Sequence, residues 1–119
     1  MNVMYKLQLG VIEIRHYVSR SGRDVFDHWL TRLADARAQA KIAVRINRLA
    51  AGNFGDCKSL GHGLFELRID WGPGYRIYYA MLGTVCVLLL CGGDKRRQSS
   101  DIDCAREYLK DYKERTETP

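Results

Sequence analysis

Apolar positions in the first half of the chain repeat with the period of a strand and then with the period of a helix. Residues 11–17 alternate apolar and polar side chains and are rich in β-branched residues, which predicts a strand. In residues 26–33 and again in 42–50, apolar side chains recur three or four positions apart, which predicts two helices. Asp35 suits the start of the second helix and Gly52 its end. Because few residues separate the helices, we expect an antiparallel helical hairpin.

The second half contains three strand-like runs in succession. Residues 64–70 and 75–81 alternate apolar and polar side chains, and the turn-forming sequence WGPG separates them. Residues 84–91 are almost wholly apolar, which is typical of a central strand covered on both faces. A polar, basic loop follows, and an apolar stripe from about Ser100 predicts a last helix.

The element order is therefore β-α-α-β-β-β-α, in a single domain of residues 1–119 whose segments 1–10 and 115–119 are peripheral. This order predicts an α+β fold with the helical hairpin on one face of an antiparallel sheet of about four strands. Strand alternation places Arg68, Arg76 and Tyr78 on the opposite, open face, and Lys58 is expected in a loop. The residues expected in the core are Trp29, Ile42, Ile46, Phe65, Leu67, Ile69, Ile77 and Tyr79.

Composition narrows the class of protein. The 119 residues are 46% apolar, which suits a folded domain, and their formal net charge of +5 favours an anionic partner. The longest apolar run, residues 85–91, is too short to span a bilayer, and the amino-terminal segment has no apolar signal region. We therefore expect a cytoplasmic protein with no membrane partner.

The four cysteines do not indicate a metal centre. No two of them have CxxC spacing, and two lie in or at the end of the apolar run, so we expect free thiols and neither a metal site nor a cofactor. They are Cys57, Cys86, Cys91 and Cys104.

Cationic side chains recur at the strand ends and along one alternating face between residues 58 and 101, where acidic residues are few. A sheet that presents Arg, Lys and Tyr in this way suits a polyanion better than a metal ion or a neutral metabolite. The pattern therefore predicts a nucleic-acid partner, with RNA favoured.

Several motifs resemble those of the RelE/ParE superfamily, the toxins of bacterial type II toxin–antitoxin modules. Within it, the chain is most similar to the addiction module killer proteins of the HigB-like branch. The resemblance extends over residues 11–112, and the GPGYR turn together with the LLLxGGDK strand end is its most specific part. The matching segments are VIEIRHY, FDHWL, RINRL, GNFGDCKSLGHGLFELRIDWGPGYRIYY and VLLLCGGDKRRQSSDI.

The resemblance implies two alternative activities. RelE-like members are metal-independent endoribonucleases that cut mRNA, usually on the ribosome, and so inhibit translation. ParE-like members share the fold but inhibit DNA gyrase without cleaving RNA. In either case the resemblance implies a cognate antitoxin, often a small helix-turn-helix protein. The dense cations of the strand face favour the first alternative.

Residues are carried over from the family one position at a time. Lys58, Arg68, Arg76 and Lys95 match the family's catalytic cations, with Lys58 a candidate base activated by the neighbouring arginines. The cations would stabilise the charge that develops on phosphorus. Arg68 and Arg76 also have a structural alternative, cross-strand ion pairs with Glu66 and Asp70. Residues assigned to RNA binding are Arg96, Arg97 and Trp71.

The family's catalytic acid has no direct match. Several RelE-like toxins carry a Tyr or His near the start of the last helix, where this chain has Ser99-Ser100-Asp101-Ile102, and this departure favours the ParE-like alternative. Tyr78 is the nearest substitute, and His62 a second. Trp71 has two interpretations: packing within its hairpin, or stacking on a base.

Overall fold

The structure is a computed structural model that describes residues 11–116. The predicted helix start at Asp35 is confirmed, since its side chain accepts hydrogen bonds from the amides of Arg37 and Ala38. The preceding helix begins at Asp24, whose side chain accepts from the Asp27 amide. The elements in chain order are β1 (Glu13–His16), α2 (Val25–Thr31), α3 (Ala36–Ala50), β2 (Cys57–Gly61), β3 (Leu64–Ile69), β4 (Tyr75–Leu82), β5 (Cys86–Asp94), the 3₁₀ turn η1 (Lys95–Arg97) and α4 (Gln98–Thr116).

The strands form one mixed sheet in the order β1-β5-β4-β3-β2, in which only the β1–β5 pair is parallel. The predicted α+β class is confirmed, but the expected number of about four strands is wrong because residues 57–61 form β2 rather than a loop. Strand β2 reads CKSLG and lies at the sheet edge. Such a short, polar edge strand lacks the alternation that identifies a strand.

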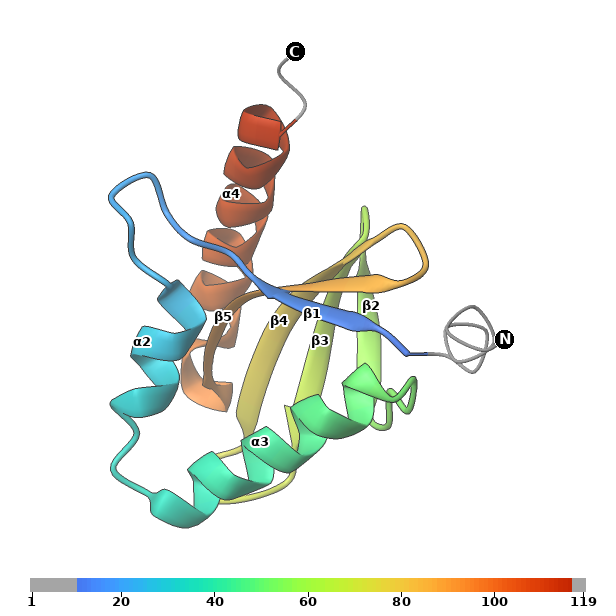
Figure 1. The fold of residues 1–119 in the computed structure, drawn as a ribbon. Coiled ribbons are helices and arrows are strands. Elements are labelled where there is room, and N and C mark those ends of the chain that lie inside the picture. Colours follow the sequence, from blue (N-terminus) through green and yellow to red (C-terminus); the bar gives the residue numbers. More distant parts are fainter. Residues whose placement is uncertain (1–10, 117–119) are drawn as a thin grey trace.

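Helices α2 and α3 cover one face of the sheet, as predicted for the helical hairpin (Figure 1). The strand phase is also confirmed, since Leu67, Ile69 and Ile77 are buried on this face. Of the other residues expected in this core, two are buried, Ile42 and Tyr79, and three are partly buried and packed against it, Trp29, Ile46 and Phe65.

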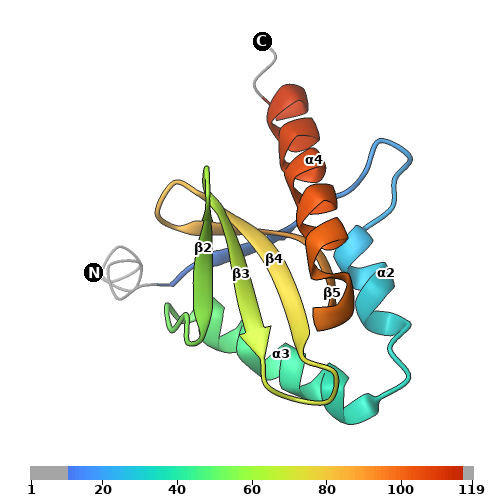
Figure 2. The same ribbon diagram turned by 180° about the vertical axis from the view of Figure 1, so that it is seen from behind.

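The opposite face is not open along its whole length, which corrects the sequence-based expectation. Ala105 and Leu109 of α4 form a second core with Tyr78, Leu88 and Leu90 of the sheet. Seen from this side, α4 lies over β5, whereas much of β2 and β3 has no helix in front of it (Figure 2). The uncovered part of this face carries the candidate site.

Strand β5 continues through Gly92 and Gly93, a segment that was expected to be a loop. A Cβ atom on Gly92 would overlap the ring of Trp29, and one on Gly93 would overlap the carboxylate of Asp101. These two glycines therefore let α2 and α4 approach opposite faces of the strand end.

This close approach makes Gly92 sensitive to any side chain. Gly92→Ala is expected to lower the free energy of unfolding by about 1–3 kcal/mol, because the Trp29 ring must shift in a packed core. Urea unfolding measures the effect, and the exposed Ser99→Ala serves as a control with a change within roughly 0.5 kcal/mol. An unchanged midpoint for Gly92→Ala would contradict the packing described here.

Candidate functional site

Three of the cations singled out from the sequence line one cleft of about 420 Å³, beside the turn between β3 and β4. Arg68 and Arg76 are direct partners in the β3–β4 register, and Lys95 begins the turn η1 that follows β5. Asp56 and Asp70 complete the charged lining. We call this site the cation cleft. Positive charge drawn from three elements in one concave site suits a phosphate group.

The two arginines of the cation cleft differ in their surroundings. The Arg68 side chain is 39% exposed, and its Nε lies 3.5 Å from Oδ1 of Asp56. The Arg76 side chain is only 12% exposed, and its Nη1 donates to the carbonyl of Tyr75 at 3.2 Å. The expectation that Arg76 faces solvent is therefore wrong. Within residues 11–116 its Nη2 makes no hydrogen bond, which leaves that group available to an oxyanion.

A buried carboxylate lies behind Arg76. Glu66 is fully buried, and its Oε2 accepts hydrogen bonds from Nε2 of Gln98 at 2.6 Å and from the hydroxyl of Tyr78 at 3.3 Å. The Nε of Arg76 lies 3.9 Å from the same oxygen, an ion pair without a hydrogen bond. A charge in this position is costly unless it is paired, so the ion pair holds Arg76 at the floor of the cation cleft.

Arg45 of α3 fixes the backbone of the cation cleft from behind. Its Nη1 donates to the carbonyl of Arg68 at 2.6 Å, and its Nη2 donates to that of Asp56 at 3.3 Å. The Arg45 side chain thus ties together the two residues whose own side chains pair within the cleft. The guanidinium of Arg45 thus turns in from α3 toward the sheet.

Lys58 and Tyr78 lie outside the cation cleft. Lys58 is exposed on β2 and pairs in register with Glu66, so it is on the same face but not in the cleft wall. Tyr78 is fully buried under α4, which corrects its expected place on an open surface. Burial raises the pKa of its hydroxyl, and the proximity of Glu66 adds to the effect. In this conformation the Tyr78 hydroxyl belongs to the Glu66 network.

The basic segment after β5 divides among three environments. Lys95 faces the cation cleft, whereas Arg97 lines a second cavity with Trp29 and Asp101. Arg96 pairs with the carboxylate of Asp94 at 3.2 Å, and this contact is the main reason that the pKa of Asp94 is lowered. The three neighbouring cations therefore do not form one binding surface.

Trp71 packs against α3 and not only within its own hairpin, and stacking on a base stays a prediction. Its indole Nε1 donates to the Asp35 carboxylate at 3.1 Å, and Nζ of Lys41 lies 4.5 Å from the ring centroid. The indole hydrogen bond is also the main cause of the lowered pKa of Asp35. Trp71 thus joins the β3–β4 turn to the start of α3, and one side of its ring is occupied.

Sequence reasoning missed two features of the site. It treated Glu66 as one member of a solvated cross-strand pair, because alternation alone does not show that α4 covers that end of the face. It also assigned no role to Asp56, which comes into the site only through β2 and the Arg45 contacts. The alternative of cross-strand pairing is confirmed between Arg76 and Glu66, whereas the partner of Arg68 is Asp56 and not Asp70.

Comparison with known proteins identifies the family. The family model described as "Phage derived protein Gp49-like" matches residues 28–110. An uncharacterised protein of Haemophilus influenzae is 57% identical over 81 residues, which are 68% of this chain and 82% of the relative. Within the described residues no helix is long and apolar enough to cross a membrane. The chain belongs to the Gp49-like phage-derived protein family, part of the addiction module killer group of RelE-like toxins.

Proposed function

We propose that this protein is the toxin of a type II toxin–antitoxin module, close to the HigB-like branch, and a metal-independent endoribonuclease that cuts mRNA and inhibits translation. The observation that carries the proposal is the convergence of Arg68, Arg76 and Lys95 in one cleft. Three guanidinium and ammonium groups around a single concave site match the charge of a phosphodiester in the transition state of cleavage.

The proposed reaction needs no group beyond the protein and the RNA. The ribose 2′-oxygen attacks the adjacent phosphorus and the bond from phosphorus to the 5′-oxygen breaks, which gives a 2′,3′-cyclic phosphate. Arg68 and Arg76 stabilise the charge on the phosphoryl oxygens, and Lys95 donates a proton to the departing 5′-oxygen. Lys58, on the neighbouring strand, is placed to contact the next phosphate along the RNA.

The 2′ proton requires an acceptor, and the carboxylates of the cation cleft supply one. Asp56 is already paired with Arg68. Asp70 is exposed and lines the cleft, and it makes no hydrogen bond or ion pair with another residue in the described part of the chain. Asp70 is therefore the proposed base, a role that replaces the one expected for Lys58.

Asp70→Asn tests this assignment. The variant is expected to lose cleavage by about 10²-fold or more, because an amide does not accept the 2′ proton. Its stability should stay within roughly 0.5 kcal/mol of the wild type, since the side chain is exposed. Single-turnover cleavage measures the loss, and Asp103→Asn, exposed on α4, is the matched control. Full activity in Asp70→Asn would remove Asp70 from the mechanism.

Expression in bacteria tests the toxin proposal directly. The chain should arrest growth and coexpression of its antitoxin, proposed to be a small helix-turn-helix protein, should relieve the arrest. Message recovered from arrested cells should carry cleavage sites that are absent from cells expressing Arg76→Ala. Normal growth at high levels of folded protein would contradict the proposal.

One observation favours a second candidate, ParE-like inhibition of DNA gyrase without RNA cleavage. The last helix begins with Gln98, Ser99 and Ser100, and the hydroxyl of Tyr78, the substitute considered for the catalytic acid, is buried. The cation cleft thus lacks the aromatic or histidine side chain that several RNA-cleaving members use. A gyrase supercoiling assay distinguishes the two candidates: the proposed ribonuclease leaves supercoiling unchanged, and the gyrase inhibitor leaves message intact.

A further inference from the structure

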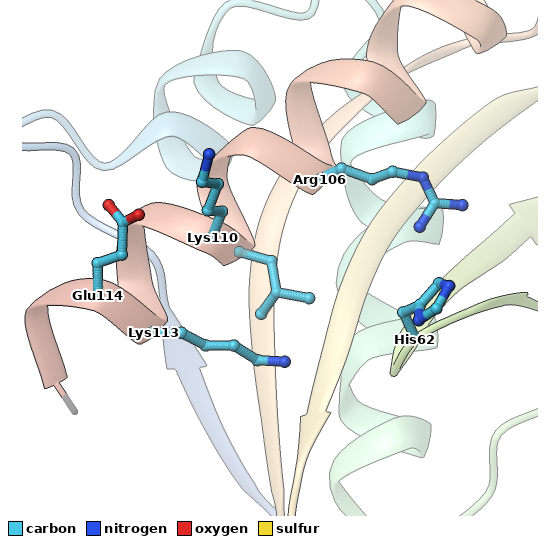
Figure 3. Close-up of a pocket in the computed structure, with 6 residues that line it drawn as sticks. His62, Arg106, Lys110, Lys113 and Glu114 are labelled. Atoms are coloured by element: carbon cyan, nitrogen blue, oxygen red, sulfur yellow. The ribbon is translucent and has the colours of Figure 1, made fainter.

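A second cleft lies between α4 and the turn that joins β2 to β3. Its volume is about 450 Å³, and it is lined by His62, Arg106, Leu109, Lys110, Lys113 and Glu114. Figure 3 shows Arg106 and Lys113 extending from α4 on the side where His62 lies. We call it the helix–hairpin cleft. It is separate from the cation cleft because the two lie at opposite ends of β3. His62 comes just before that strand, whereas the Gly72–Gly74 turn of the cation cleft comes after it.

The lining of the helix–hairpin cleft carries three cations and one acid, and so has a net positive charge. Lys110 and Lys113 are exposed, and within the described residues neither pairs with a carboxylate. Arg106 is held in place because its Nη2 donates to the carbonyl of Leu60 at 2.8 Å. The one acid of the lining, Glu114, lies 4.0 Å from Nη2 of Arg20, and the neighbouring acid Asp111 is bound by Arg20 and Arg115. The cleft therefore presents more cations than acids on one helix.

The turn that closes the cleft is strained. His62 has a φ of 56°, and it is the one non-glycine residue between 11 and 116 with a positive φ. Glycines flank it on both sides. A histidine tolerates this conformation better than most residues, yet glycine would adopt it without strain. The imidazole is therefore kept at the mouth of the cleft at some cost in backbone energy, which is common at binding sites.

We propose that the helix–hairpin cleft binds an acidic, amphipathic segment of a partner protein, and within the toxin–antitoxin assignment that partner is the antitoxin. Carboxylates of the segment pair with Lys110 and Lys113, and an apolar side chain packs over Leu109 at the cleft floor. RNA fits less well, because His62 is the one ring among the six lining residues on which a base would stack, and the apolar Leu109 offers nothing to a phosphate. The proposal rests on the family assignment and does not require RNA cleavage.

A short synthetic helical peptide with a stripe of Glu beside a stripe of Leu tests the proposal by calorimetry or anisotropy. It should bind the wild-type protein, and the same peptide with Gln in place of Glu should not. Lys110→Gln/Lys113→Gln should weaken binding about tenfold, from two charge contacts. Arg32→Gln/Arg37→Gln removes the same charge at exposed positions of the other helices and should leave the affinity unchanged. Circular dichroism confirms that each variant is folded.

Two results would overturn the proposal. Equal loss of peptide affinity in both double variants would show a general effect of net charge. If the Lys110→Gln/Lys113→Gln variant instead keeps its affinity for the peptide but loses affinity for a short oligouridylate, the cleft is an RNA site. RNA cleavage is measured in parallel, so that a failure of the binding proposal can be distinguished from a failure of the ribonuclease proposal. The Lys110/Lys113 variant should cleave normally, and peptide binding by a protein that cleaves no RNA would count only against the ribonuclease.

Discussion

Replacing Arg76 by alanine is expected to reduce RNA cleavage by about 10²-fold or more, because one donor is lost from a preorganised anion site. Arg76 is the least exposed cation of the cation cleft, and within residues 11–116 its Nη2 makes no hydrogen bond. Cleavage of a labelled message by the purified protein, followed in single-turnover conditions, measures the loss. The exposed Arg32→Ala is the matched control and should cleave at the wild-type rate.

Arg76→Ala also leaves the buried carboxylate of Glu66 without its counter-charge, so a fall in activity alone would not distinguish catalysis from stability. Arg76→Lys keeps a positive charge near Glu66 but loses the forked donor geometry of the guanidinium. It should therefore fold with nearly wild-type stability and still cleave far more slowly. Wild-type cleavage by a folded Arg76→Lys would indicate that charge alone suffices.

Glu66→Ala is expected to lower the free energy of unfolding by about 3–5 kcal/mol, the usual effect of removing one partner of a buried ion pair. The substitution leaves Arg76 without its counter-charge and the amide of Gln98 without its buried acceptor. Because Gln98 is the first residue of α4, the attachment of that helix to the sheet should weaken as well. Urea unfolding followed by circular dichroism gives the stability change.

The conservative Glu66→Gln removes the charge but keeps the shape and the hydrogen-bonding capacity of the side chain. We expect it to be less destabilising than Glu66→Ala and still to reduce cleavage, since Arg76 loses the ion pair that holds it. Glu107→Gln, exposed on α4, is the matched control for loss of a carboxylate. Equal stability of Glu66→Ala and wild type would contradict the buried network described here.

Local patterns predicted most of the fold. Alternation in β3 and β4 gave the correct strand phase, and the stripe of α3 together with Asp35 gave the correct helix start, because these features depend on near neighbours in sequence. Strand β2 was not predictable in this way. It forms because β3 offers a free edge, and its own residues have neither apolar alternation nor a β-branched side chain.

The candidate site was predicted in part for the same reason. Arg68, Arg76 and Lys95 were identified because strand ends and pairing register bring them together. The burial of Tyr78 and Glu66 depends on where α4 lies, and α4 can lie there because Gly93 has no side chain to meet Asp101. No local pattern specifies how a distant helix crosses a sheet, so both side chains were expected at an open surface.

Cleavage of RNA in the cation cleft by attack of a ribose 2′-hydroxyl would leave fragment ends of a defined kind. The most direct measurement is the chemistry of the ends produced when the purified protein acts on message in a ribosome-containing translation extract. We predict a 2′,3′-cyclic phosphate on one fragment and a free 5′-hydroxyl on the other, with no cleavage where the site carries a 2′-deoxyribose. Fragments ending in a 3′-hydroxyl and a 5′-phosphate, or a message left intact while gyrase is inhibited, would contradict the account.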